Sequence, residues 1–62
     1  MIAPFDIFKE KEGSLLWCGE ALTLEEAKAK VKAMAESEKT EYVIFSQKTG
    51  NRIVIQPDGS ES

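Results

Sequence analysis

The sequence contains no histidine and only one cysteine, Cys18. Without histidine, the side chain that most often serves as a general base near neutral pH is missing, and a single cysteine cannot form an internal disulfide. The available metal ligands are reduced to carboxylates and one thiol. We therefore expect a protein that is not an enzyme and has no catalytic residue, metal site or cofactor. Cys18 is expected to pack in a strand as a small hydrophobic side chain.

Long apolar runs are also missing. No stretch approaches the roughly 18 consecutive apolar residues of a membrane span, and residues 1–6 lack the basic flank and apolar centre of a signal peptide. The formal net charge of -3 disfavours binding to a phosphate backbone. These features predict a cytoplasmic protein that does not bind membranes and whose main partner is not a nucleic acid. The single thiol agrees with a reducing compartment.

The length of 62 residues allows only one hydrophobic core. A domain of this size buries only about 60% of the surface that its unfolded chain exposes, so its stability is marginal. Small domains often depend on disulfides, metals or partners, and the first two are not expected here. The remaining aid is a protein partner, which includes a second copy of the chain.

The first part of the sequence predicts a β-hairpin. Residues 5–10 mix aromatic and β-branched side chains with charges at nearly every other position, which is typical of a half-buried strand. Residues 15–20 form the second strand, and Gly13 between them suits a short turn. Because the loop length is open, the pattern does not decide which face of the hairpin carries Trp17.

A helix is predicted after this hairpin, because Thr23 and Glu26 have the spacing of a capping box. The following residues, from Leu24 to about Glu36, include no glycine or proline. Five residues at helical spacing form the face expected to pack on a sheet: Leu24, Ala27, Val31, Met34 and Ala35. Glu26 and Lys30 are expected to pair on the solvent side.

The last part of the sequence predicts a second hairpin. Residues 41–47 have the strongest β character in the chain, and residues 52–56 form the fourth strand. Lys48-Thr49-Gly50 suits a three-residue loop closed by glycine. That loop predicts two cross-strand pairs, Phe45 with Ile53 and Val43 with Ile55.

These elements predict an α+β fold in the order ββαββ, with a four-stranded, mainly antiparallel sheet and one helix packed on one face. We expect one domain over residues 1–57 and a flexible C-terminal tail over residues 58–62, because Pro57 ends the last strand. The strand order 2-1-3-4 makes the whole sheet antiparallel. The order 2-1-4-3, with strands one and four parallel, is also compatible with the sequence.

Large apolar side chains are predicted on both faces of the sheet, although one helix covers only one of them. The second-hairpin register assigns four of them to the helix side: Val43, Phe45, Ile53 and Ile55. The uncovered face then carries the candidate interaction residues: Phe8, Trp17, Tyr42, Ile44 and Val54, with Leu16 as an alternative to Trp17. These residues predict an exposed patch that contacts a protein partner or forms a homodimer. The alternative interpretation is scattered, half-exposed strand residues.

A nucleic-acid-binding accessory is the second functional hypothesis. It combines the basic run Lys28 to Lys32 with the aromatic strand residues Phe8, Tyr42 and Phe45, since aromatics stack on bases. Neighbouring glutamates instead favour a solvated, salt-bridged helix. The remaining carboxylates considered as ligands lack the spacing of a calcium loop and are expected to be solvated: Glu10, Glu12 and Glu20.

Two resemblances accompany these predictions. The stretch Gly19 to Ala27, where Thr23-Leu24-Glu25-Glu26-Ala27 opens a helix after a hairpin, resembles the corresponding step in HicB-like antitoxin domains. The whole arrangement is similar to short uncharacterised bacterial proteins of unknown function, which implies the ββαββ fold and no chemistry. The first resemblance implies a regulatory, antitoxin-like role as an alternative. The residues themselves favour a non-enzymatic module that binds a protein or self-associates.

Overall fold

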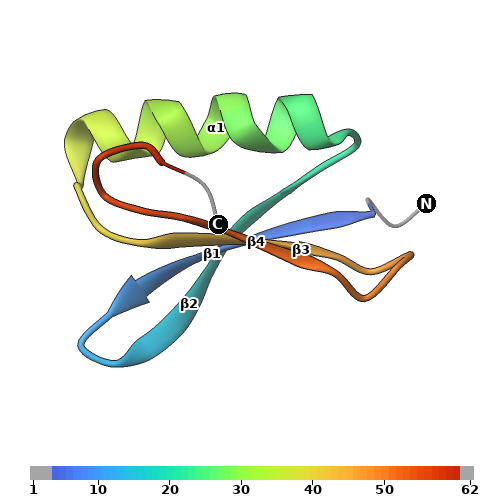
Figure 1. Ribbon diagram of the computed structural model, residues 1–62, viewed down its shortest axis with the longest axis horizontal. Coiled ribbons are helices and arrows are strands. Elements are labelled where there is room, and N and C mark those ends of the chain that lie inside the picture. Colours follow the sequence, from blue (N-terminus) through green and yellow to red (C-terminus); the bar gives the residue numbers. More distant parts are fainter. Residues whose placement is uncertain (1–3, 61–62) are drawn as a thin grey trace.

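The computed structural model describes residues 4–60, which form four strands and one helix in the order ββαββ. The elements are β1 (Phe5–Lys11), β2 (Ser14–Ala21), α1 (Leu24–Ser37), β3 (Tyr42–Ser46) and β4 (Arg52–Ile55). All strand pairs are antiparallel, the strand order is β2-β1-β3-β4, and α1 lies along one side of the sheet (Figure 1). The predicted α+β class and the order 2-1-3-4 are confirmed. The first three residues of the predicted domain 1–57 lie outside the described part.

A two-residue turn joins β1 to β2. Lys11 pairs with Ser14, and the two residues between them have positive φ angles, 52° for Glu12 and 82° for Gly13. This is the geometry of a type I′ turn, whose twist matches that of the flanking strands. The Glu10 carboxylate accepts a hydrogen bond from the Gly13 amide over 3.0 Å and thereby stabilises the turn.

A β-bulge divides β2 into two segments. Ile7 pairs with Gly19 and Phe8 pairs with Trp17, so that Cys18 is an additional residue on the β2 side. Such a bulge bends the strand and increases its twist. Cys18 is half-buried and packs against the hydrophobic core, as the sequence predicted.

The second hairpin has a loop one residue longer than predicted. The Ser46 amide donates a hydrogen bond to the Asn51 carbonyl over 2.8 Å, and residues 47–50 form the loop between them. Gly50 closes this loop with a φ of 79°. A closing glycine in this conformation suits loops of three or four residues, so the glycine did not reveal the loop length.

The longer loop reverses the predicted faces of β3. Tyr42 and Ile44 pair with two isoleucines of β4 and belong to the core beneath α1, where each is 1% exposed. A shift of one residue in register moves side chains to the other face of a sheet. The prediction that Tyr42 and Ile44 lie on the uncovered face was therefore wrong. Val43 and Phe45, which were assigned to the helix side, lie on the uncovered face instead.

Helix α1 begins as the sequence predicted. The Thr23 hydroxyl accepts a hydrogen bond from the Glu26 amide over 3.1 Å, which satisfies one of the free donors at the helix start. The Glu26 carboxylate lies 3.4 Å from the Lys30 ammonium, the expected pair on the solvent side. The predicted inner face is confirmed, because Ala27 and Val31 are buried and the three others pack against the core: Leu24, Met34 and Ala35.

Every strand and the helix contribute to one core. Its buried members are Ile7, Ala21, Ala27, Val31, Tyr42, Ile44 and Ile55. The core therefore lies entirely between α1 and one face of the sheet, and it leaves the opposite face without a covering element among residues 4–60 (Figure 1).

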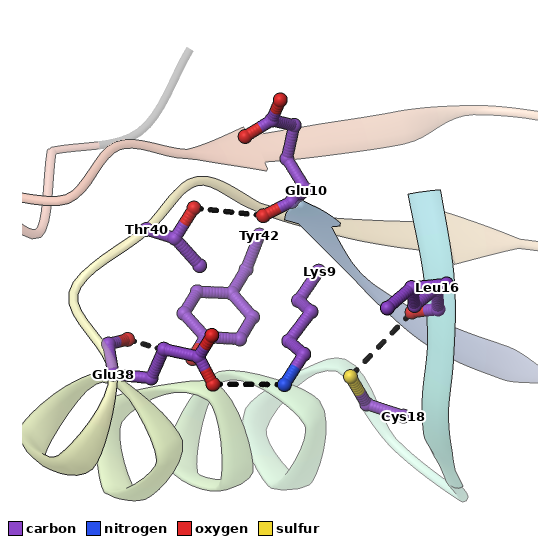
Figure 2. A network of polar contacts seen from close by, with 7 residues as sticks. All are labelled: Lys9, Glu10, Leu16, Cys18, Glu38, Thr40 and Tyr42. Carbon is purple, nitrogen blue, oxygen red and sulfur yellow. Dashed lines mark hydrogen bonds and ion pairs between the residues drawn. The ribbon is translucent and has the colours of Figure 1, made fainter. Parts of the chain in front are cut away.

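Polar contacts anchor the end of α1 to the sheet (Figure 2). The Tyr42 hydroxyl donates to the Glu38 carbonyl over 2.8 Å, and the Lys9 ammonium lies 2.8 Å from the Glu38 carboxylate. The Thr40 hydroxyl donates to the Glu10 carbonyl, also over 2.8 Å. Because its hydroxyl is hydrogen-bonded, Tyr42 can occupy the core without leaving a polar group unpaired.

The chain after β4 folds back as a turn. The Asp58 carboxylate accepts hydrogen bonds from the Ser60 amide and hydroxyl, which lower the pKa of Asp58. A groove of about 470 Å³ separates this turn from α1, and Lys28 and Lys32 are among the residues that line it. Residues 58–60 of the predicted tail are thus hydrogen-bonded in a turn, and residues 61–62 lie outside the described part. The flexibility of the tail stays a prediction.

Candidate interaction surface

The uncovered face of the sheet carries a line of apolar side chains, one from each strand. Phe8 pairs with Trp17 on one side and with Val43 on the other, and Val43 pairs with Val54. Paired residues in an antiparallel sheet share a face. We call Trp17, Phe8, Val43 and Val54 the apolar row. It crosses the whole sheet on the side away from α1.

Polar side chains border the apolar row and orient the indole of Trp17. The Asp6 carboxylate accepts a hydrogen bond from the Trp17 indole nitrogen over 3.3 Å and another from the Gln47 amide nitrogen over 2.5 Å. Asp6 pairs with Glu20 on β2 and Phe45 on β3, which places mainly polar residues next to the apolar row. The apolar row is therefore bordered on this side mainly by polar side chains.

Exposure increases along the apolar row from β3 toward β2. Val43 is only 7% exposed, Phe8 and Val54 are half-buried, and Trp17 is 60% exposed. The other exposed large hydrophobic side chains of the described residues also lie on β2 or directly after it: Leu15, Leu16 and Leu22, at 50%, 44% and 62%. Together with Trp17 they form what we call the β2 patch, in which Leu15 and Trp17 lie on the uncovered face and Leu16 on the helix side.

The backbone of β2 is open on its outer side. Within residues 4–60, β2 pairs with β1 alone. The Glu10 amide donates to the Glu41 carbonyl on the far side of β1, so Glu10 turns its backbone groups away from β2. Its partner Leu15 is consequently in a non-hydrogen-bonded pair and directs its own N–H and C=O outward. Trp17, two residues later, does the same, whereas Leu16 between them faces β1.

The outer side of β2 has one of the usual protections of an edge strand, the bulge at Cys18, but lacks the others. Exposed edges in soluble proteins commonly carry charges or proline that prevent pairing with another chain. The segment Ser14–Gly19 has neither a charged residue nor a proline. The opposite edge strand, β4, is shorter and is followed directly by Gln56 and Pro57. Among residues 4–60, β2 is therefore the strand that combines an open edge with exposed large apolar side chains.

Three of the five predicted interaction residues meet on the uncovered face, namely Phe8, Trp17 and Val54. Tyr42 and Ile44 do not, because they lie in the core. The prediction missed most of the β2 patch: Leu15 and Leu22 were not named, and Leu16 was only an alternative. Counting outward from a two-residue Glu12-Gly13 turn would have paired Phe8 with Trp17 and located the patch.

The residues of the nucleic-acid hypothesis do not share one surface. Lys28 and Lys32 line the groove on the helix side of the sheet, whereas Phe8 lies on the opposite face. Of the two other aromatics named for base stacking, Tyr42 is buried, and Phe45 lies on the same face as Phe8. A single strand of nucleic acid would have to contact both sides of the sheet to use the lysines and Phe8 together.

No protein-family model, no curated protein and no solved structure matches the chain. The resemblance of Gly19 to Ala27 to HicB-like antitoxin domains therefore stays a prediction. In residues 4–60, the single helix is too short and too polar to cross a lipid bilayer.

Proposed function

We propose that this chain is a non-enzymatic protein-interaction module, which docks a protein through the outer edge of β2 and the adjoining apolar row. The observation that carries the proposal is the β2 patch. Its exposed leucines and tryptophan gather on an edge strand whose outer backbone hydrogen-bonding groups have no partner strand among residues 4–60. An extended segment added at this edge would satisfy the backbone groups and cover the side chains together.

The energetics of a small domain support a docking role. Fully burying a leucine side chain stabilises by about 1.5–3 kcal/mol, so covering the half-exposed Leu15 and Leu16 contributes roughly 1 kcal/mol each. Net stabilities of small domains are of the order of only 5 kcal/mol. A partner at β2 would consequently add a substantial fraction of the stability of the free chain.

A reactive role for Cys18 has little support. The thiol is half-buried, packs against the core and lies 3.5 Å from the Leu16 carbonyl (Figure 2). No histidine exists to deprotonate it. The free thiol also supports a reducing location such as the cytoplasm, which we include in the proposal.

The proposed function can be tested with displayed peptides. A library of random ten-residue peptides is selected on the immobilised chain and counter-selected on a Leu15→Lys, Trp17→Lys double variant. We expect selected peptides to perturb the amide resonances of Leu15 and Trp17 in a nuclear magnetic resonance titration. A matched variant on the helix surface, Lys32→Glu, should bind them unchanged. The proposed function is wrong if no peptide binds wild type more strongly than the double variant and a second copy of the chain does not do so either.

A further inference from the structure

We propose that the occupant of the β2 edge is a second copy of this chain, which pairs antiparallel about a two-fold axis at Leu16. This inference rests on the proposed function and names its partner. The resulting dimer would join the two sheets into one of eight strands, since each copy contributes four. Both α1 helices would lie on the same side of it, because a two-fold axis perpendicular to the sheet preserves its faces.

The register follows from the backbone directions of β2. Hydrogen-bonded residues across the two-fold must both direct their N–H and C=O outward, and before the bulge Leu15 and Trp17 do so. Pairing Leu15 with the partner's Trp17 uses both residues and brings Leu16 opposite its own copy. Pairing Leu15 with the partner's Leu15 would instead place Trp17 opposite the partner's Gly13, in the turn. Pairing Trp17 with the partner's Trp17 would place Leu15 opposite the partner's Gly19, beyond the bulge.

Of the three registers, the one centred on Leu16 gives apolar pairs at Leu15, Leu16 and Trp17. Leu15 and Trp17 lie on the uncovered face, because their partners on β1 are Glu10 and Phe8. Leu15 of each copy would contact Trp17 of the other copy. Such pairs of an aromatic and an aliphatic side chain stabilise antiparallel sheets. The two apolar rows would then continue from one sheet into the other. On the helix side, Leu16 would contact the partner's Leu16.

The absence of charge makes the segment suited to its own copy. Two identical strands that carry charges of one sign repel each other when they pair, whereas Ser14 to Gly19 carry none. In the register centred on Leu16, the first like charges to face each other are those of Glu12 and the partner's Glu20, beyond this segment, and their repulsion adds to the expected weakness of the dimer. A heterologous partner needs no such neutrality, so the observation favours a second copy.

The size of the contact predicts a weak dimer. Stable interfaces bury about 800 Å² on each partner, which would be nearly a fifth of the 4330 Å² exposed by the chain. One short strand edge provides less than this area. We therefore expect a dissociation constant on the order of 10–100 μM, as for small transient interfaces.

Site-specific cross-linking tests the register. In a Cys18→Ala background, Leu16→Cys places one thiol on each copy at the two-fold, where Cα atoms of a non-hydrogen-bonded pair lie about 4.5 Å apart, within disulfide range. Leu15→Cys in the same background is the matched control. Its two copies are offset by two residues, so their Cα atoms lie roughly 8 Å apart, beyond disulfide range. We expect the Leu16→Cys chain to form a disulfide-linked dimer at least about ten times faster than the control.

Sedimentation across a concentration series completes the test. Wild type is expected to pass from monomer to dimer below 1 mM, and Leu16→Lys to remain a folded monomer with an unchanged circular dichroism spectrum. A wild-type chain that stays monomeric at 1 mM, or equal cross-linking of the two cysteine variants, overturns the inference. Peptides that still bind Leu15 and Trp17 in that case would leave the proposed function intact, so the two failures are distinguishable.

Discussion

The hydroxyl of Tyr42 donates a hydrogen bond to the carbonyl of Glu38 over 2.8 Å, which ties the first residue of β3 to the C-terminal end of α1 (Figure 2). The ring is 1% exposed and the bond spans the connection between helix and sheet. Replacing Tyr42 by phenylalanine keeps the ring and removes this bond. We expect Tyr42→Phe to lower the free energy of unfolding by about 1–2 kcal/mol in urea titrations. An unchanged free energy of unfolding would show that the bond contributes nothing to stability.

Burial also predicts how stability changes at high pH. Desolvation, the largest cause, raises the pKa of Tyr42 above its ordinary value, and the Glu38 carboxylate adds to this. A raised pKa of an acid means that folding favours the neutral form. The stabilising contribution is therefore complete below the ordinary pKa and is lost as the pH rises through the folded value. Urea unfolding at about pH 8 and pH 11 should show a smaller alkaline loss for Tyr42→Phe than for wild type. Equal losses would contradict the assignment.

The ion pair between Lys9 and Glu38 predicts an effect at low pH. The hydrogen bond from Lys9 lowers the pKa of Glu38, and the same bond raises the pKa of Lys9. The contribution of Glu38 is thus present above its ordinary pKa and is lost as the pH falls through the lowered value. In carbon-13 titrations of the side-chain carboxyl, Lys9→Met should move the Glu38 pKa upward toward its ordinary value. Lys48→Met, in the second hairpin loop, serves as the control and should leave it unchanged.

Two glycines offer a matched test of backbone strain. Gly13 has a φ of 82°, whereas Gly19 has no positive φ, and an added Cβ would meet no atom within 4 Å at either position. Gly13→Ala should therefore destabilise by about 1–2 kcal/mol through the left-handed conformation alone. Gly19→Ala should change the free energy of unfolding by less than this. Thermal unfolding monitored by circular dichroism distinguishes them, and equal stabilities would contradict the type I′ turn.

Trp17 provides an internal probe, because it is the one tryptophan of the chain. Its indole is largely exposed in the free chain, and association through β2 would remove it from water. We expect its emission maximum to move to shorter wavelength as the protein concentration rises through about 10–100 μM. The Leu16→Lys variant should show no such shift. A wild-type spectrum that does not change with concentration would argue against contact at Trp17.

Local signals predicted the fold well. The Thr23 N-cap and the spacing of Ala27 and Val31 involve neighbours within one helix, so the sequence shows them directly. Hairpin registers depend on loop length, and one additional loop residue was enough to exchange Tyr42 and Ile44 for Val43 and Phe45 on the uncovered face. Alternation along β3 does not distinguish these pairs, because both carry large apolar side chains.

The polar partner of Tyr42 could not be predicted either. An aromatic residue with a hydroxyl is as suitable for an exposed sheet as for a core with a nearby acceptor. That acceptor, the Glu38 carbonyl, becomes available only where the helix ends against the sheet. In the candidate site, the pair Phe8 and Trp17 follows from the local hairpin turn, whereas Val54 joins it only through the long-range pairing of β1 with β3.

The bulge at Cys18 separates β2 into two segments that pair with β1 in different registers. Residues 14–17 take their register from the hairpin turn, while Gly19 to Ala21 follow a register one residue away that leads into α1. Removal of the single residue Cys18 would merge the two registers and leave every other cross-strand pair of the hairpin as it is. Cys18 thus acts as a spacer, and the chain can shorten here by one residue without exchanging the side chains that face the core for those that face a partner.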